Sequence, residues 1–304
     1  MTLRQTQSER CREFGVAMSA IKLIAVCARL YWSEVKNINV NKRGNAMFKN
    51  MKIGMRLGLG FGLLACTYLA GAEEITATPY RPTISNPAEL PAVGWLEVEM
   101  GVVRSKGGEN QWQNNQPYTL KYAFSQDFGI LLSGDLRVNQ VDAVGQQTAG
   151  QGDNILIFKH RFGASEGQAF GLEWGTKLDT ATTGLGSGKS DYILNGIYSV
   201  DVGEVRIDTN FGATWLSLRE EGLGRYQFNW AVAASKELMP KWTVAAELSG
   251  TARHGKNDTT QFLTAASYAI TNKLMVDFGV AAGISGIVPN WSVFAGVTWL
   301  VGGY

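Results

Sequence analysis

The sequence predicts an all-β fold: a single antiparallel transmembrane β-barrel of about 12 strands, preceded by a signal peptide. Two observations carry this prediction. From Tyr118 to the C-terminus, apolar and polar residues alternate along one segment after another, and a period of two indicates strands with unlike faces. The connections between these segments are alternately long and short, as in outer-membrane barrels with short periplasmic turns and longer outer loops.

A segment with the layout of an export signal precedes the predicted barrel. Met47 to Arg56 is short and basic, and Leu57 to Ala70 is apolar; the small residues Ala70-Gly71-Ala72 follow. This order is typical of a secretory signal peptide, which we place at residues 47–72. A cut before Cys66 is the alternative, because the residues around it resemble a lipoprotein box.

Residues 1–46 lie upstream of this signal peptide, where no mature sequence is expected. We interpret them as a mis-annotated upstream extension, with translation starting at Met47 or Met51. All three cysteines precede the predicted cleavage site. An exported chain without disulfides depends on strand pairing and on its environment for stability.

Residues 73–91 contain prolines and show no alternation. They form either a periplasmic lead-in or a plug folded into the lumen. Residues 92–304 then form the barrel. The alternation predicts strands at 94–103, 116–124, 128–139, 153–162, 168–179, 191–201, 203–217, 226–236, 241–253, 259–269, 273–284 and 290–303.

The apolar parity of these strands is expected to face lipid. On one strand it comprises Tyr226, Phe228, Trp230 and Val232, and the central span of this face carries no Asp, Glu, Lys or Arg in any strand. An Arg or Lys facing lipid at the bilayer midplane would cost about 2–4 kcal/mol. Tyr and Trp gather near strand ends, as in the aromatic girdles of membrane barrels. A soluble barrel, the alternative, would not need so many outward aromatic side chains.

The opposite parity is charged, with mixed signs, and is expected to line the lumen. Buried charges need partners or water, so these residues either pair across the lumen or line a wet passage. Twelve strands lie between filled eight-stranded barrels and open porins, which leaves both a narrow channel and a closed interior open. The predicted lumen charges are Glu97, Glu99, Lys121, Asp135, Arg137, Lys159, Arg161, Glu173, Lys177, Arg206, Asp208, Glu247 and Asp277, with Glu204 and Arg253 on the same parity.

Catalytic chemistry finds little support in the sequence. A hydrolase would need a histidine beside a serine with an orienting acid, and only His254, above Ser249, approaches that arrangement. His160 falls near the periplasmic rim, and no cluster has the spacing of metal ligands. The glycine-rich stretch 184–189 lacks the spacing and context of a phosphate-binding loop. We therefore expect neither an enzyme nor a cofactor.

Composition limits the partners. The formal net charge of +2 gives no reason to expect a nucleic acid. We expect outer-membrane lipid, the barrel-assembly machinery and a small-molecule permeant as partners of a protein in the outer membrane of a Gram-negative bacterium.

Several short motifs resemble one known family, the outer-membrane barrels associated with the meta-pathway of phenol degradation. The similarity spans about residues 78 to 304, with Asp179 where that family has proline. It implies an outer-membrane barrel that transports small, often aromatic compounds, and it identifies no catalytic residue. The matching motifs are Arg81-Pro82-Thr83, Ser85-Asn86-Pro87, Gly94 to Gly101, Gly152-Asp153-Asn154, Lys177 to Thr180, Gly186 to Asp191 and Asn210-Phe211-Gly212.

The expected function is therefore that of an outer-membrane channel or transporter-like barrel for small molecules, including aromatic or hydrophobic ones. The alternative is a structural or surface-interaction barrel with a closed lumen, and an outer-membrane hydrolase is third.

Overall fold

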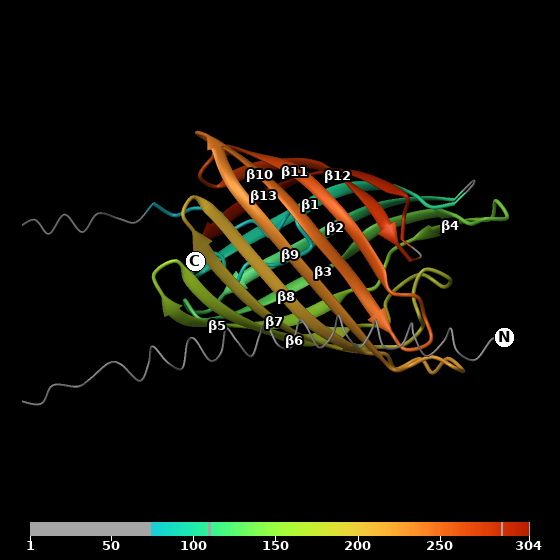
Figure 1. Ribbon diagram of the computed structural model, residues 1–304. Helices are drawn as coiled ribbons and strands as arrows, with labels where there is room; N and C mark the ends of the chain where they lie inside the picture. The colour runs from blue at the N-terminus through green and yellow to red at the C-terminus, as the bar shows by residue number, and fades with distance from the viewer. Residues whose placement is uncertain (1–73, 109–110, 287, 304) are drawn as a thin grey trace, which may run out of the picture. The chain divides into compact units, whose positions relative to one another are not determined.

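The computed structural model describes residues 74–108, 111–286 and 288–303 (Figure 1). The predicted signal peptide and the upstream extension lie outside the described residues. No helix in the described ranges is long and apolar enough to cross a membrane.

The described chain is built from thirteen β-strands. They are β1 (Trp95–Lys106), β2 (Trp112–Ala123), β3 (Phe128–Val141), β4 (Gln147–Gly150), β5 (Ile155–Ser165), β6 (Gln168–Lys177), β7 (Asp191–Val202), β8 (Val205–Trp215), β9 (Tyr226–Met239), β10 (Trp242–Arg253), β11 (Thr259–Thr271), β12 (Leu274–Ser285) and β13 (Trp291–Gly303).

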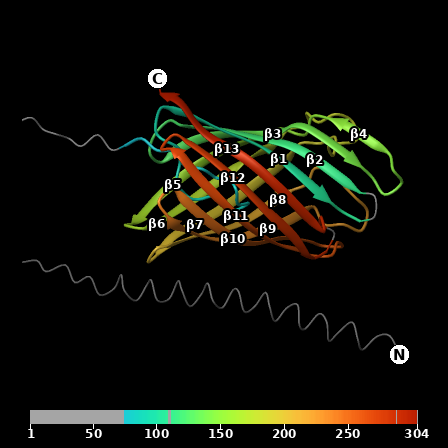
Figure 2. The same ribbon diagram turned by 90° about the horizontal axis from the view of Figure 1, so that it is seen from above.

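Twelve of these strands close into a barrel. Strands β5 to β13 pair in sequence order, β13 pairs with β1, β1 with β2, β2 with β3, and β3 with β5. All of these pairings are antiparallel, and the ring of strands is visible in both views (Figures 1 and 2). Closure leaves no unpaired edge along the wall. The predicted fold, an antiparallel barrel of twelve strands, is confirmed.

The short strand β4 does not belong to the barrel wall. It pairs only with the end of β3, from Val138↔Gly150 to Val141↔Gln147, and extends a hairpin beyond the barrel (Figure 1). The sequence predicts a long polar loop over residues 140–152 here. Likewise β2 begins at Trp112, four residues before the expected start at residue 116. Pairing with β3 satisfies backbone groups there without any apolar face.

The two ends of the barrel differ in their connections. At one end the connections are tight, such as Gly203-Glu204 between β7 and β8 and Pro240-Lys241 between β9 and β10. Gly203 (φ 61°) and Lys241 (φ 73°) adopt the left-handed conformation that such turns require. At the other end lie residues 178–190 and 216–225. Short periplasmic turns and long outer loops are the pattern of outer-membrane barrels.

The outward face of the wall is an apolar belt. Large apolar side chains that point away from the lumen stay exposed, whereas their neighbours along each strand are buried or half-buried, as expected from the pleat. A closed barrel with such a belt is a structure that satisfies its backbone groups within lipid, and the protein is an outer-membrane barrel. Exposed members of the belt include Met100, Val102, Phe170, Leu194, Phe211, Phe228, Leu248, Phe278, Val293 and Trp299.

Candidate functional site

A segment of the chain that precedes β1 lies inside the barrel. Residues 77–90, which we call the lumen segment, enter and leave at the periplasmic end: the Ala77 amide donates to Asn272 in a short turn, and β1 begins soon after Leu90. Its cyan trace runs within the wall of strands (Figures 1 and 2). Tyr80, Ser85 and Ala88 are at most 5% exposed, so the segment is buried in the lumen.

Tyr80 anchors the first half of the lumen segment. Its amide donates to Glu99 Oε1 at 2.6 Å, and its hydroxyl donates to the Glu89 carbonyl at 2.7 Å. Lys121 Nζ lies 3.7 Å and Lys159 Nζ 4.1 Å from the centre of its ring. Two ammonium groups against one aromatic ring form cation–π contacts, which are stronger where water is excluded.

The two lysines are themselves paired with carboxylates of the wall. Lys121 Nζ lies 2.6 Å from both Glu97 Oε1 and Glu99 Oε1, and Lys159 Nζ lies 3.2 Å from Glu173 Oε1. All five side chains are at most 5% exposed. Charges buried in this way require close partners and further hydrogen bonds.

Arg81 crosses to the opposite side of the lumen. Its Nε and Nη2 donate to the two carboxylate oxygens of Asp277 at 3.1 and 3.0 Å, the bidentate geometry that makes such pairs strong. The guanidinium lies over two glycines of the wall. An added Cβ would come within 2.7 Å of it at Gly101 and within 2.4 Å at Gly296. The wall therefore leaves room for Arg81 by omitting two side chains.

The second half of the lumen segment is held through its backbone. The amides of Ile84 and Ser85 both donate to Glu247 Oε2 at 2.8 Å. Asn86 exchanges bonds with Asn210, and the Ala88 amide donates to Ser199 Oγ at 2.8 Å. A segment with prolines and no strand partner leaves amides unpaired, and wall side chains satisfy them here.

Asn86 and Glu89 complete the attachment. Asn86 Nδ2 donates to both oxygens of Glu173, at 3.0 and 3.2 Å. Glu89 pairs with Arg206, which also contacts Asp208 and Asp201 near the periplasmic end. The lumen segment thus contacts side chains of eight strands around the wall, which are β1, β2, β5, β6, β7, β8, β10 and β12.

Other predicted lumen charges lie at the two ends of the barrel. Asp135 accepts a bond from Asn115 at 3.0 Å. Lys177 bridges Asp153 at 3.0 Å and Asp191 at 2.9 Å beneath an outer loop. At the periplasmic rim Arg161 lies 3.7 Å from Asp127. The hydrogen bonds and ion pairs described for these three side chains do not involve the lumen segment.

Two further residues of the inward parity were predicted to line the lumen. Glu204 is an exposed turn residue 2.8 Å from Lys236, and Arg253 pairs with Glu220 at 3.0 Å under an outer loop.

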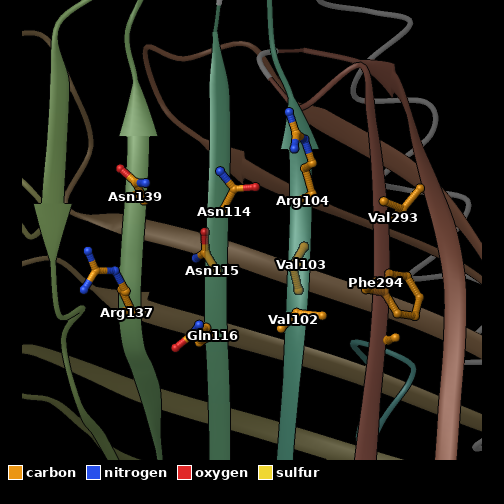
Figure 3. Close-up of a pocket in the computed structure, with 11 residues that line it drawn as sticks. Val102, Val103, Arg104, Asn114, Asn115, Gln116, Arg137, Asn139, Val293 and Phe294 are labelled. Atoms are coloured by element: carbon orange, nitrogen blue, oxygen red, sulfur yellow. The ribbon is translucent and has the colours of Figure 1, made fainter.

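Arg137 departs from its predicted place in the lumen. The pairing of β2 with β3 shifts between Asn115↔Val138 and Pro117↔Asp135, so β3 holds one extra residue at Leu136–Arg137. A bulge of this kind re-aims side chains. Both bulge residues are exposed, and Arg137 lines a groove with Val102 and Gln116 on the outward parity (Figure 3). The period-two argument fails at the inserted residue.

The lumen segment separates two cavities. The outer chamber, of about 370 Å³, lies above Ile84 and Asn86. The periplasmic chamber, of about 460 Å³, lies below residues 77–83. Inward side chains of the outer chamber are mostly amides and hydroxyls, namely Asn195, Asn210, Asn229, Ser249, Thr251 and Gln261, together with Ile193 and Glu173.

The histidines weighed for catalysis lie apart from these chambers. His254 lines a pocket among the outer-loop residues 219–223. Ser249 Oγ accepts a hydrogen bond from Gln261 Nε2 at 3.3 Å, and both residues line the outer chamber. His160 packs edge-on against Phe162 at 4.3 Å. Among the described residues, no group of three His, Cys, Asp or Glu could hold a metal ion.

The glycines beneath Arg81 give a testable prediction. A methyl group at Gly296 would lie within 2.4–2.7 Å of the guanidinium, so Gly296→Ala should push Arg81 away from Asp277 and loosen the lumen segment. We expect faster hydrogen exchange of the Tyr80 amide in this variant. Gly302 has no atom within 4 Å of its Cβ position, and Gly302→Ala is the matched control. Equal exchange rates of the Tyr80 amide in the two variants would show that Gly296 is not needed to make room for Arg81.

Lowering the pH should protonate Asp153 and so loosen the outer loop that its carboxylate holds. Desolvation would raise the pKa of its carboxyl, but hydrogen bonds from Lys177 and the amides of Ala181 and Thr180 outweigh it and lower the pKa. The stabilisation is therefore present above the unfolded pKa of about 3.9 and is lost as the pH falls through the lower folded value.

Hydrogen exchange of the Thr180 and Ala181 amides, corrected for intrinsic rates, measures this release. It should accelerate on acidification in the native protein, whereas Asp153→Asn should exchange quickly at neutral pH already. If neither low pH nor Asp153→Asn changes the corrected exchange rates of these two amides, Asp153 does not hold the loop.

Comparisons with known proteins agree with the barrel. No protein-family model and no curated protein sequence matches this chain. An outer-membrane channel of Pseudomonas putida F1 superposes with a TM-score of 0.59 at 15% identity, over 70% of this chain and 98% of the channel. The NanC porin superposes with a TM-score of 0.50 at 11% identity, over 68% of this chain and 100% of the porin. At these identities the likeness shows the fold.

Proposed function

We propose that this outer-membrane barrel is a channel for small molecules, which the lumen segment closes in the state described. The observation that carries the proposal is the division of the lumen. Both chambers lie inside the barrel, and residues 77–90 lie between them. A barrel of this size without a central segment would have an open interior, intermediate between filled eight-stranded barrels and porins.

The chemistry of the outer chamber supports small uncharged permeants. Its charged residue Glu173 is already paired with Lys159 and Asn86. The remaining lining offers amide and hydroxyl groups beside the apolar Ile84 and Ile193. Small-molecule sites typically combine an apolar surface with a small number of precisely placed polar groups. A molecule with an apolar ring and hydroxyl groups fits this lining.

The proposed cargo, small aromatic or hydrophobic compounds, agrees with the resemblance to the barrels of phenol degradation. Membership of that family is part of the same proposal. Its support is the placement of the motif residues: Arg81, Asn86 and Asn210 hold the lumen segment, and Asp153 and Asp191 hold an outer loop. The names of the two similar structures, a channel and a porin, support passage of a solute through the barrel and do not bear on the cargo.

Solute uptake into proteoliposomes tests the proposal. Vesicles that contain the purified protein should swell faster than protein-free vesicles in small uncharged solutes such as catechol, and swelling should slow when Asn229→Leu and Thr251→Leu fill the outer chamber. The control is Gln146→Leu, in the exposed β3–β4 turn. A barrel that admits no solute, with or without its lumen segment, would instead be the structural barrel with a closed interior.

A further inference from the structure

A groove on the lipid-facing wall, near the outer end, has a composition unlike the rest of the apolar belt. It is lined by side chains of β13, β1, β2 and β3, has a volume of about 500 Å³ and contains two arginines, Arg104 and Arg137. Figure 3 shows Arg104, Asn114 and Asn139 on three neighbouring strands, with Val102, Gln116 and Arg137 one step below.

The strand register places these side chains outside the barrel. Glu97 and Glu99 of β1 point into the lumen, so the residues of the other parity, Val102 and Arg104, point outward. Arg104 pairs with Asn114, and Asn114 pairs with Asn139, which aligns one guanidinium and two amides across the wall. The bulge in β3 adds Arg137 to this face.

Aromatic residues orient the basic side chains at this height. Arg104 Cζ lies 4.5 Å and Lys106 Nζ 5.2 Å from the centre of the Trp112 ring. Trp112 packs edge-on against Trp291 at 5.5 Å. Tyr and Trp mark the membrane interface in barrels, so the cations lie where lipid headgroups meet acyl chains.

No Asp or Glu is among the residues that line the groove, so no carboxylate of the lining neutralises the two arginines. The strands that carry Arg104 and Arg137 are two spacings apart, about 10 Å, within the joint reach of two arginine side chains. Guanidinium groups bind phosphate oxygens in bidentate fashion. Val293, beside Arg104, and Val102, level with Arg137, are 42% and 56% exposed, an apolar surface on which an acyl chain can lie.

We propose that this groove binds a phosphate-bearing lipid of the outer leaflet, with Arg104 and Arg137 on the phosphate, Asn114 and Asn139 as further donors, and the valines beneath the acyl chains. Charge complementarity and the continuity of the basic rim with the apolar belt favour a lipid over a soluble anion. The groove lies outside the barrel, so lipid binding there is independent of what passes through the lumen.

Native mass spectrometry of the full-length mature protein in nanodiscs that contain lipid A tests this site. The native protein should retain lipid A, and Arg104→Gln with Arg137→Gln should weaken retention by about tenfold or more. Lys189→Gln with Lys256→Gln, which removes two exposed cations from outer loops, is the charge-matched control and should retain lipid A normally.

Two further arms identify the ligand. Lipid A stripped of its phosphates should bind the native protein as weakly as lipid A binds the double variant. Inorganic phosphate should not displace lipid A at equal concentration. Equal retention by the double variant and the control would overturn the site, binding of the stripped lipid would overturn phosphate recognition, and displacement by inorganic phosphate would overturn the lipid as its occupant.

Discussion

Deletion of residues 77–90 should raise the single-channel conductance of the barrel several-fold. The lumen segment lies between the two chambers and contacts side chains of eight strands. Its removal leaves a lumen wider than that of a filled eight-stranded barrel. Both ends of the segment lie at the periplasmic end, so the deletion leaves every strand of the wall intact.

A second variant separates the contacts of the segment from its mere presence. Replacing residues 77–90 by a Gly/Ser sequence of equal length keeps the chain but removes Tyr80, Arg81 and Asn86. We expect intermediate conductance with frequent transitions, because nothing fixes the replacement to the wall. Unchanged conductance in both variants, measured in planar bilayers at the same salt concentration, would show that the segment does not block the passage.

Lys121→Met should destabilise the folded barrel by about 3–5 kcal/mol, the usual effect of removing one partner of a buried ion pair. Lys121 lies 2.6 Å from both Glu97 and Glu99, and all three side chains are at most 3% exposed. Its loss leaves two carboxylates without a cation, although backbone amides of Thr78 and Tyr80 still donate to them. Urea unfolding in lipid vesicles measures the change.

Rescue and a control make this prediction specific. Combining Lys121→Met with Glu97→Gln and Glu99→Gln should restore most of the stability, because the neutral amides need no counter-charge. Lys236→Met removes a pair in which the side chains are 40% and 82% exposed and should cost less than about 1 kcal/mol. If the triple variant unfolds as early as the single variant, packing rather than charge explains the loss.

Period-two alternation was sufficient to predict the barrel, and it assigned the charged residues to the lumen face by parity. Glu97, Glu99, Lys121, Lys159 and Glu173 lie on the inward parity, and each is buried in the structure. A strand exposes alternate residues to opposite environments, so a charge on the polar parity of a membrane strand has only the lumen to face. Where the register is regular, parity alone locates a side chain.

The partners of these charges could not be predicted in the same way. Tyr80, Arg81 and Asn86 lie in a segment without periodicity, where nothing local states which wall residue each will meet. The one available signal was the concentration of polar side chains and prolines before the first strand. The contacts arise from tertiary packing inside a closed wall.

Arg137 shows where parity itself misleads. One extra residue in β3 reverses the faces of all residues beyond it. Val138 is therefore buried and Arg137 exposed, the opposite of an uninterrupted alternation. The hairpin of β3 and β4 was missed for a different reason, since a strand pair beyond the membrane needs no apolar face.

A reversible cross-link between the lumen segment and the wall tests most directly whether this segment controls passage. The Ala88 amide donates to Ser199 Oγ at 2.8 Å, so the two positions are close enough for a disulfide. The described residues contain no cysteine, and Ala88→Cys with Ser199→Cys therefore introduces a single cysteine pair. Mass spectrometry verifies that the pair is oxidised. Single-channel currents should be absent when the pair is oxidised and return on reduction. Identical currents in the two states would contradict a channel closed by its lumen segment.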